Sequence, residues 1–221
     1  MMPPANPLAS ACDQVGMTAY LRSKLVPDRP TMASVHGRAE VGRIAPADPA
    51  KALALAHAIP DAWYRAQALS CVAQHARESS VGSIVGEAIA AAYDCSDAYN
   101  TVAVMAWPLR AAWSRGRQAY ARTELDRVLR LAPEVEPRAS RIFALHCLWS
   151  GCDAADEAFA EPIWQTILAL CNPDHHWRAA RLYRHIAEAR EQRQAGSAAS
   201  VIEAMPEGKA RTALARRFKL A

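Results

Sequence analysis

The sequence predicts an all-α protein assembled from repeated helix pairs. A short pattern recurs along the chain, in which a proline and an acidic residue are followed by three variable residues and an arginine. Hydrophobic residues make up 52% of the 221 residues, and many are alanine, which favours helix. No stretch alternates β-branched or aromatic residues with polar ones over the length of a strand. Together these observations favour stacked helices over a sheet.

The pattern is complete in four places, and a fifth copy keeps Asp97 but has Thr101 where arginine is expected. The four acid–arginine pairs are Asp61 with Arg65, Glu134 with Arg138, Asp174 with Arg178, and Glu207 with Arg211. Successive copies are 33 to 40 residues apart, a period typical of helical-hairpin repeats. The predicted fold is an α-solenoid of about five antiparallel helix hairpins, because one hairpin cannot bury both of its faces alone.

The chain divides into two parts at residue 32. Prolines interrupt residues 1–31, where apolar periodicity is weak, so this segment is predicted to be a poorly ordered N-terminal extension. Residues 32–221 are predicted to form a single helical-repeat domain that opens with a short helix at 32–45. The five helix pairs are expected at residues 50–59 and 61–77, 84–93 and 97–115, 117–132 and about 135–150, 154–171 and 174–194, and 197–205 and 207–220.

Prolines, glycines and serines predict where these helices break. Residues 78–83, with the sequence ESSVGS, are predicted to form a turn. Pro108 is expected to kink or shorten its helix, Pro137 to start the second helix of the third pair, and Pro162 to delay the first helix of the fourth pair. Gly116 is expected to stop the helix before it.

Each repeated acid lies four residues before its arginine, so the two share one face of a helix. An exposed pair of this kind contributes only a few tenths of a kcal/mol, which is too little to account for four copies. We therefore expect the arginine to reach the acid of the next unit and to form a ladder between stacked hairpins.

The segment from Asp61 to Leu69 (DAWYRAQAL) resembles the turn and second helix of HEAT-like repeats, and Asp174 with Arg178 is similar. The resemblance covers about residues 50–221, with glutamate replacing aspartate in two units and Thr101 interrupting the pattern. The Trp-x-x-Leu-Gly start of TPR units is absent. The resemblance implies that the acid and arginine are structural, and that the second helices line a concave surface on which a partner binds.

Candidate binding residues break the repeat pattern. His175, His176 and Trp177 place aromatic and polar groups at one turn, a composition favoured at binding hot spots, although a solvated turn would also explain them. A basic stripe on the inner surface, suited to an acidic peptide or a phosphate backbone, is expected from Arg141, Arg178, Arg181 and Arg184. The alternative for the stripe is an ordinary solvated face.

Other constellations are expected to be structural. Cys147, Cys152, Cys171 and His175 have a loose zinc-like spacing, but short ligand spacings are missing, so buried cysteines without metal are favoured. The tryptophans are expected to be core residues, and His185 a partly buried packing residue. No phosphate-binding loop, dinucleotide motif or nucleophile elbow is present, so neither a cofactor nor a catalytic residue is expected.

Bulk properties favour a cytoplasmic chain without a membrane span. The formal charge is +4, no apolar run approaches the length of a span, and the first residues lack the pattern of a signal peptide. We expect a non-catalytic scaffold that binds a protein or peptide. The alternative is a nucleic-acid-binding protein related to HEAT-like DNA alkylation-repair glycosylases, with Asp94 or Asp97 beside Trp107 and Trp113.

Overall fold

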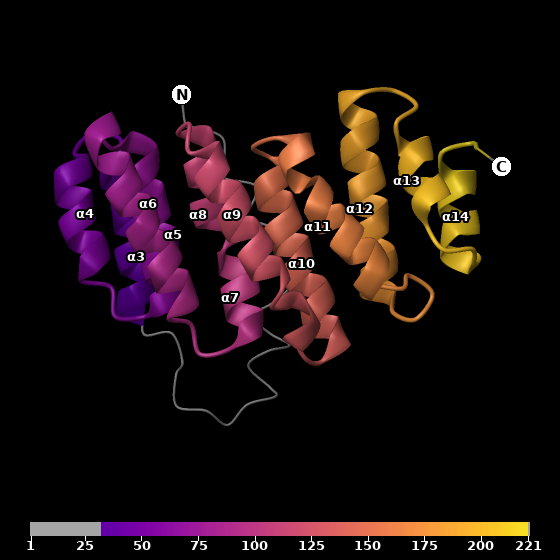
Figure 1. Cartoon of the computed structure of the whole chain (residues 1–221), viewed down its shortest axis with the longest axis horizontal. Coiled ribbons are helices and arrows are strands. Elements are labelled where there is room, and N and C mark those ends of the chain that lie inside the picture. The colour runs from indigo at the N-terminus through magenta and orange to yellow at the C-terminus, as the bar shows by residue number, and fades with distance from the viewer. Residues whose placement is uncertain (1–31, 221) are drawn as a thin grey trace.

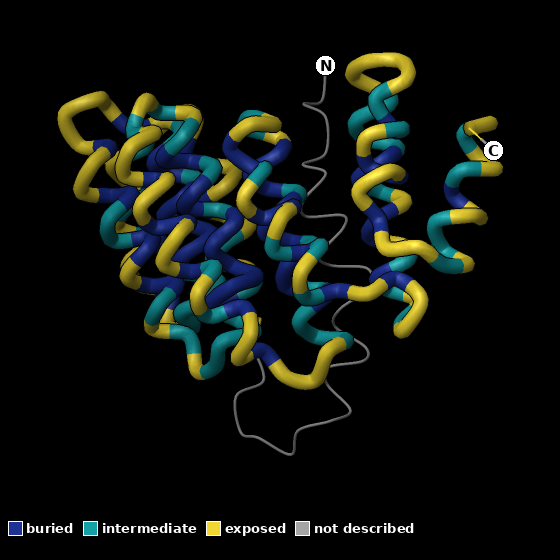
Figure 2. The backbone as a smooth tube through the Cα atoms, turned by 45° about the vertical axis from the view of Figure 1, so that its right-hand side comes forward, coloured by how far each residue is buried: buried dark blue, intermediate teal, exposed yellow. Residues whose placement is uncertain are grey.

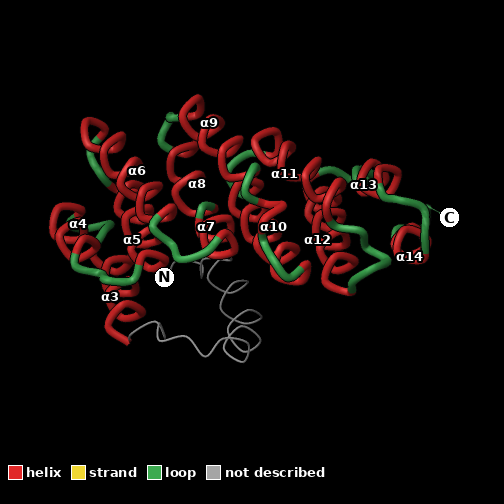
Figure 3. The backbone as a smooth tube through the Cα atoms, turned by 60° about the horizontal axis from the view of Figure 1, so that its bottom comes forward, coloured by secondary structure: helices red, strands yellow, loops and turns green. Residues whose placement is uncertain are grey.

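The computed structural model describes residues 32–220, which contain helices and loops and no strand (Figure 3). The prediction for residues 1–31 lies outside the described residues. The first helices are α3 (Met32–Ile44), α4 (Pro49–His57), α5 (Ala62–His75), α6 (Glu78–Tyr93), α7 (Ala98–Val104) and α8 (Ala106–Ser114). They are followed by α9 (Gln118–Leu129), the 3₁₀ turn η1 (Ala132–Glu134), α10 (Arg138–Asp153), α11 (Glu157–Leu170), α12 (Trp177–Arg193), α13 (Ala198–Ala204) and α14 (Lys209–Arg217).

The helices stand side by side in a row that follows the chain from α4 to α14 (Figure 1). Helix α5 packs against α4, α6 and α8, and α10 packs against α7, α8 and α11. Farther along, α12 contacts α10 and α13, and α13 contacts α14. These contacts connect the helices along the row. None of the helices in residues 32–220 is long and apolar enough to cross a membrane.

Small side chains form much of the buried interior of the first half of the row. Figure 2 shows buried residues along the inner faces of the helices and exposed residues mainly on outer faces and loops. Ala66, Ala73, Ala88, Ala92 and Ala112 have no exposed surface. Alanine combines high helix propensity with little bulk, so this part of the chain brings helix backbones close together.

The all-helical prediction is confirmed for residues 32–220, and most predicted helices lie within a few residues of the observed ones. The predicted turn at residues 78–83 is wrong, because α6 begins at Glu78. Val81 is fully buried and opens an apolar stripe that continues through Ile84 and Val85. The spacing of these residues stabilises a helix, which overrides the turn-like composition of the serines and glycine.

Two prolines have different effects. A break at Met105 separates α7 from α8. Pro108 lies three residues later, and its ring conflicts with the carbonyl of Val104, four residues before it. The expected interruption is therefore present. Pro162 lies inside α11, which begins at Glu157, so the prediction that Pro162 delays this helix is wrong. Buried Phe159 and Ile163 on either side hold the helix together across the proline.

Aspartates at the starts of helices act as N-caps. The Asp61 carboxylate accepts a hydrogen bond from the backbone N–H of Tyr64 (3.2 Å), and Asp97 does the same for Asn100 (2.8 Å). Capping satisfies amides that the first helical turn leaves without partners. The repeated acid therefore has a local role at the start of α5 and α7.

An arginine near the start of α5, α10 and α14 binds the loop before it. Each donates to the carbonyl oxygen of the residue six positions earlier, which is a buried apolar residue. The pairs are Arg65 to Ile59 (3.1 Å), Arg141 to Val135 (3.1 Å) and Arg211 to Met205 (3.3 Å). The structure thus places Arg141, rather than Arg138, as the equivalent of Arg65, because α10 begins at Arg138 itself.

Contacts between helices distant in the sequence use other partners than the predicted acid–arginine pairs. Arg65 reaches Asp94 (3.3 Å), three residues before Asp97. Asp174 accepts a hydrogen bond from the backbone N–H of Ala210 (2.8 Å) rather than from Arg211. A Cβ at Gly208 would collide with the Asp174 carboxylate, so glycine permits this close approach between units.

A second set of arginine contacts lies at the opposite ends of the helices. Arg115, directly after α8, donates to the carbonyls of Ala73 (2.9 Å), Gln74 (2.8 Å) and Ala76 (3.0 Å) at the end of α5. Arg193, at the end of α12, binds Asp153 at the end of α10 (Nη1–Oδ1 2.8 Å). Cations suit the unsatisfied carbonyls of helix C-termini, so Arg115 joins the end of α8 to the end of α5, and Arg193 joins the end of α12 to the end of α10.

Candidate binding surface on α10, α12 and α14

Trp177 is a large aromatic side chain held in solvent at the start of α12. It is 61% exposed, and the imidazole of His176 stacks on it with ring centroids 6.0 Å apart. The Arg178 guanidinium lies 5.3 Å from the centroid of the Trp177 ring. His176 also caps the helix, because its Nδ1 accepts a hydrogen bond from the Arg178 N–H (3.1 Å). The indole is therefore positioned by both neighbours and still faces outward.

Arg181 and Arg184 continue the same face of α12. They follow Trp177 by four and seven residues, a spacing that places side chains above one another on a helix. Both are exposed. Arg184 lies 3.9 Å from Glu188, whereas Arg181 makes no ion pair or hydrogen bond with any residue in the 32–220 range. This face of α12 therefore combines an exposed indole with an unpaired guanidinium.

A histidine pair links α12 to α10 beside Arg181. The His146 Nε2 and His185 Nδ1 atoms are 2.6 Å apart, one donating and the other accepting. The rings are nearly perpendicular, with centroids 4.8 Å apart. Trp149 of α10 contacts His185 edge-on, with ring centroids 5.6 Å apart. The pair thus joins two helices by a direct side-chain contact.

Burial keeps this histidine pair neutral. Desolvation, reinforced by His185 and by the charge of Arg181, lowers the pKa of His146 to about 3. Desolvation also lowers the pKa of His185, and Arg181 and Arg184 act in the same direction, while Glu188 and Asp153 oppose the shift. A neutral imidazole pair has one donor and one acceptor for its shared hydrogen bond, so the two rings hold each other without a charge.

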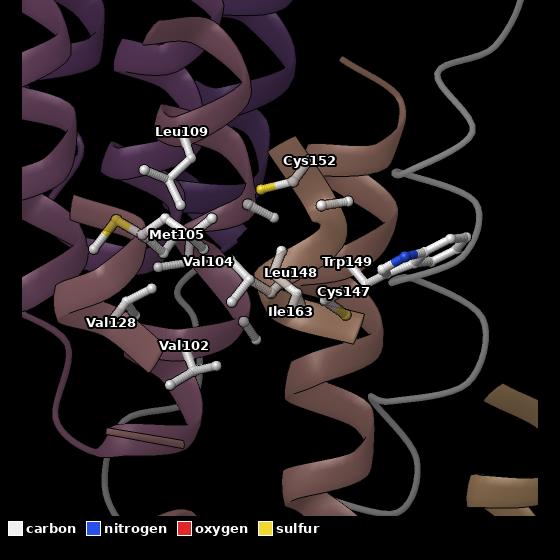
Figure 4. Packing of buried hydrophobic residues seen from close by; sticks show 14 of the residues in the cluster. Val102, Val104, Met105, Leu109, Val128, Cys147, Leu148, Trp149, Cys152 and Ile163 are labelled. Atoms are coloured by element: carbon white, nitrogen blue, oxygen red, sulfur yellow. The ribbon is translucent and has the colours of Figure 1, made fainter. Parts of the chain in front are cut away.

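Helix α10 presents different residues to its two sides (Figure 4). Leu148 and Cys152 point toward the cluster around Met105 and Leu109, whereas Trp149 points to the other side of the helix. Trp149 is 2% exposed. The apolar side of α10 anchors the helix to α7 and α8, and this leaves the Trp149 and His146 positions for the contact with α12.

Helix α14 adds further positive charge on the far side of α12. Arg217 binds Glu188 (2.7 Å), and Arg216 is exposed. Residues 177–217 contain nine lysines and arginines and four acids, while the whole chain has a formal charge of only +4. The positive excess of the chain is therefore concentrated in this segment.

Acids already neutralise two of the α12 arginines. Arg190 binds Glu157 (3.2 Å) and Glu161 (2.9 Å) on α11. Arg193 binds Asp153 and also approaches Glu157 (3.6 Å). The cations at the end of α12 thus belong to the contacts between helices, whereas Arg181 remains available.

The structure brings together some of the predicted binding residues and places one of them, Arg141, outside this surface. His176, Trp177, Arg181 and Arg184 lie on α12 or directly before it, and His175 is exposed in the preceding loop. Arg141 does not belong to this surface. Its side chain is 13% exposed and donates to two loop carbonyls and to Glu136, because it occupies the position of Arg65.

Other predicted constellations are not assembled. Cys147, Cys152 and Cys171 are buried free thiols, and burial raises the pKa of Cys171 to about 11. Within residues 32–220, no three His, Cys, Asp or Glu side chains form a group that could hold a metal ion. Arg138 is exposed and has no ion pair among these residues.

Asp94, Asp97 and Trp113 of the glycosylase alternative each have contacts within the fold. Asp97 caps the start of α7, and Asp94 binds Arg65. Trp113 lies near the end of α8, where it stacks on Phe159 with ring centroids 4.1 Å apart. These residues therefore have roles in capping and packing within the fold.

The sequence predicts one member of the histidine pair as a packing residue but does not predict the pair. His185 is expected to be a partly buried packing residue, and part of its ring is buried. No sequence pattern points to His146, because it lies among apolar residues of α10 and its partner is 39 positions away. Only the packing of α12 on α10 brings the two rings together.

Comparisons with protein-family models, with curated proteins and with solved structures find no match for this chain.

Proposed function

We propose that the chain is an α-solenoid of helix hairpins that binds a protein partner through the face of α12 that carries Trp177. The pairs α4–α5, α6 with α7–α8, α9–α10, α11–α12 and α13–α14 are the proposed hairpins. Three observations support them: the recurring arginine-to-carbonyl bonds, the stacking contacts of Arg115 and Arg193, and the row in Figure 1. The hairpins resemble HEAT-like units, and their role is that of a non-catalytic scaffold.

The exposed indole of Trp177 is the observation that carries the binding proposal. Tryptophan and arginine are enriched at the centres of protein interfaces, and here an indole lies between His176 and Arg178 with Arg181 one turn along. Most other tryptophans in the described part of the chain are wholly or partly buried by neighbours, including Trp149 and Trp164 at 2% exposure. Trp177 is therefore the tryptophan whose position core packing does not explain.

The same surface fits nucleic acid less well. Binding of single strands combines a basic groove with several aromatic side chains on which successive bases stack. Tyr120 and Trp177 are the exposed aromatic residues in the 32–220 region, and they lie on different helices, α9 and α12. A single stacking position beside one unpaired arginine favours a protein or peptide partner.

The proposal is tested by recovery of partners from an extract of the native cell on immobilised protein. Trp177→Ala is compared with wild type and with Tyr120→Ala, which removes the exposed aromatic residue outside the proposed surface. Loss of a hot-spot tryptophan costs about 2 kcal/mol or more, roughly a thirty-fold loss of affinity. We expect a protein that wild type and Tyr120→Ala retain and that Trp177→Ala loses. Equal retention by the two variants would contradict the proposal.

A further inference from the structure

The surface around Trp177 also indicates the chemistry of its partner. Arg181 is exposed, and its guanidinium has neither an ion pair nor a hydrogen bond within residues 32–220. It lies one helical turn from both Trp177 and His185, since these residues are four positions before and after it. An unpaired guanidinium between an exposed indole and a neutral imidazole pair is an open position for an anion.

The neighbours of Arg181 limit what can bind there. Arg184 adds a second exposed cation and lies 3.9 Å from Glu188, and Glu188 is also bound to Arg217 at 2.7 Å. Asp153 is held by Arg193. Glu188 and Asp153, the acids whose charges act on His185, are therefore already paired, and Arg181 and Arg184 offer exposed positive charge to an anion.

We infer that this face binds an acidic segment of the partner, with a carboxylate on Arg181 and an apolar side chain against Trp177. The inference rests on the proposed function and specifies the chemistry of the partner. The planar guanidinium of an arginine binds a carboxylate through two parallel hydrogen bonds. Positive charge over residues 177–217 speeds the approach of such a segment and selects against basic ones. The occupant is thus a peptide rich in Asp or Glu with at least one apolar residue.

The identity of the anion is tested with a short fluorescein-labelled peptide of Glu, Ser and one Leu, and with the same peptide carrying Gln in place of Glu. Fluorescence anisotropy measures the affinity of each for the full chain. We expect the Glu peptide to bind and the Gln peptide to bind at least about ten-fold more weakly. A labelled thymidine oligonucleotide of equal charge is measured in parallel. Tighter binding of the oligonucleotide than of the Glu peptide would overturn the inference in favour of a phosphate backbone.

A matched pair of charge reversals distinguishes binding at Arg181 from general electrostatic attraction to the basic segment. Arg181→Glu and Arg216→Glu change the net charge equally, and Arg216 is an exposed residue of α14 in the same basic segment. We expect Arg181→Glu to weaken the Glu peptide about ten-fold and Arg216→Glu to weaken it about two-fold. Equal weakening would show a diffuse electrostatic effect and would overturn the assignment to Arg181.

Nuclear magnetic resonance gives a second readout at the same place. Titration with the Glu peptide is expected to shift the ring signals of His146 and His185, because the bound carboxylate lies beside them, and to leave His36 on α3 unchanged. Shifts at His36 alone would overturn the inference. If Trp177→Ala abolishes recovery of the native partner while Arg181→Glu does not, the proposed function stands and only the acidic chemistry fails.

Discussion

The two ends of the helix row are held together by different kinds of contact. Around α5, α6 and α8, alanines with no exposed surface bring helices together, and Arg115 binds carbonyls at a helix end. Around α11 and α12, bulky rings and ion pairs join the helices: Trp164 meets Tyr183 with ring centroids 5.2 Å apart, and Arg190 binds acids of α11. Close packing of small residues holds α5, α6 and α8 together as a scaffold. The large and charged residues of α11 and α12 join these helices and still leave exposed arginines on the surface of α12.

This difference assigns separate roles to the two regions. In the first region the buried face is apolar, and Arg65 and Arg115 donate to backbone carbonyls. The second region exposes Trp177 and carries the positive excess of the chain. We therefore expect the first region to determine the stability of the chain and the second to determine what it binds.

The largest expected effect is a cavity in the first region. Leu109 on α8 is completely buried, and Leu109→Ala is expected to lower the free energy of unfolding by about 3 kcal/mol. Leu214→Ala in α14 is the matched change near the other end of the row, where the leucine is 6% exposed. Because α14 stands at the end of the described row, where it packs against α13, it can open locally, and we expect Leu214→Ala to cost about 1 kcal/mol. Urea denaturation followed by circular dichroism measures both, and an equal or larger loss for Leu214→Ala would break the comparison.

A smaller effect is expected where α10 approaches α8. A Cβ at Gly151 would lie 2.7 Å from the Cβ and 3.0 Å from the carbonyl oxygen of Ala106. Gly151→Ala is therefore expected to destabilise the chain by about 2 kcal/mol, since backbone must move. Gly86→Ala in α6 is the control, because a Cβ there meets no atom within 4 Å. Gly86→Ala is expected to stabilise the chain by up to about 1 kcal/mol. If both variants stabilised the chain, or both destabilised it, the close approach of α10 to α8 at Gly151 would be contradicted.

The smallest expected effect is a pH dependence of stability that comes from the histidine pair between α10 and α12. In the folded chain the pKa of His146 is about 3, whereas in the unfolded chain it is near 6.5. Below pH 6.5 the unfolded state therefore takes up a proton that the folded state does not, and stability falls as the pH falls toward 3.

We expect wild type to lose about 1 kcal/mol more than His146→Gln per pH unit between pH 6.5 and 5.5. Urea denaturation at the two pH values measures the difference. His75→Gln, which changes an exposed histidine at the end of α5, serves as the control and is expected to follow wild type. Parallel behaviour of wild type and His146→Gln would show that the histidine pair is not held neutral by the fold.

Local sequence patterns predicted most helices but not how the units contact each other. Proline, glycine and apolar spacing are local signals, so the helix limits and the break before Pro108 could be read from them. The register of the third unit could not, because Arg138 and Arg141 both follow the loop, and only the start of α10 shows which one reaches the Val135 carbonyl. The turn predicted at residues 78–83 failed because burial of Val81 outweighs local composition.

The candidate surface was predictable only in part for the same reason. Trp177, Arg181 and Arg184 stand at helical spacing, so their shared face follows from the sequence. The pairing of His146 with His185 depends on how α12 lies on α10, and nothing in either helix alone specifies it. Whether an arginine is free also depends on distant acids, as the contrast between Arg181 and Arg193 shows.

Hydrogen–deuterium exchange on the chain with and without its recovered partner tests the central claim most directly, because it compares the two regions in one measurement. Binding at the proposed surface is expected to slow exchange in α12, from Trp177 onward, and to leave α5 and α6 unchanged. Protection confined to α5 through α8, with α12 unaffected, would contradict the assignment of binding to the second region.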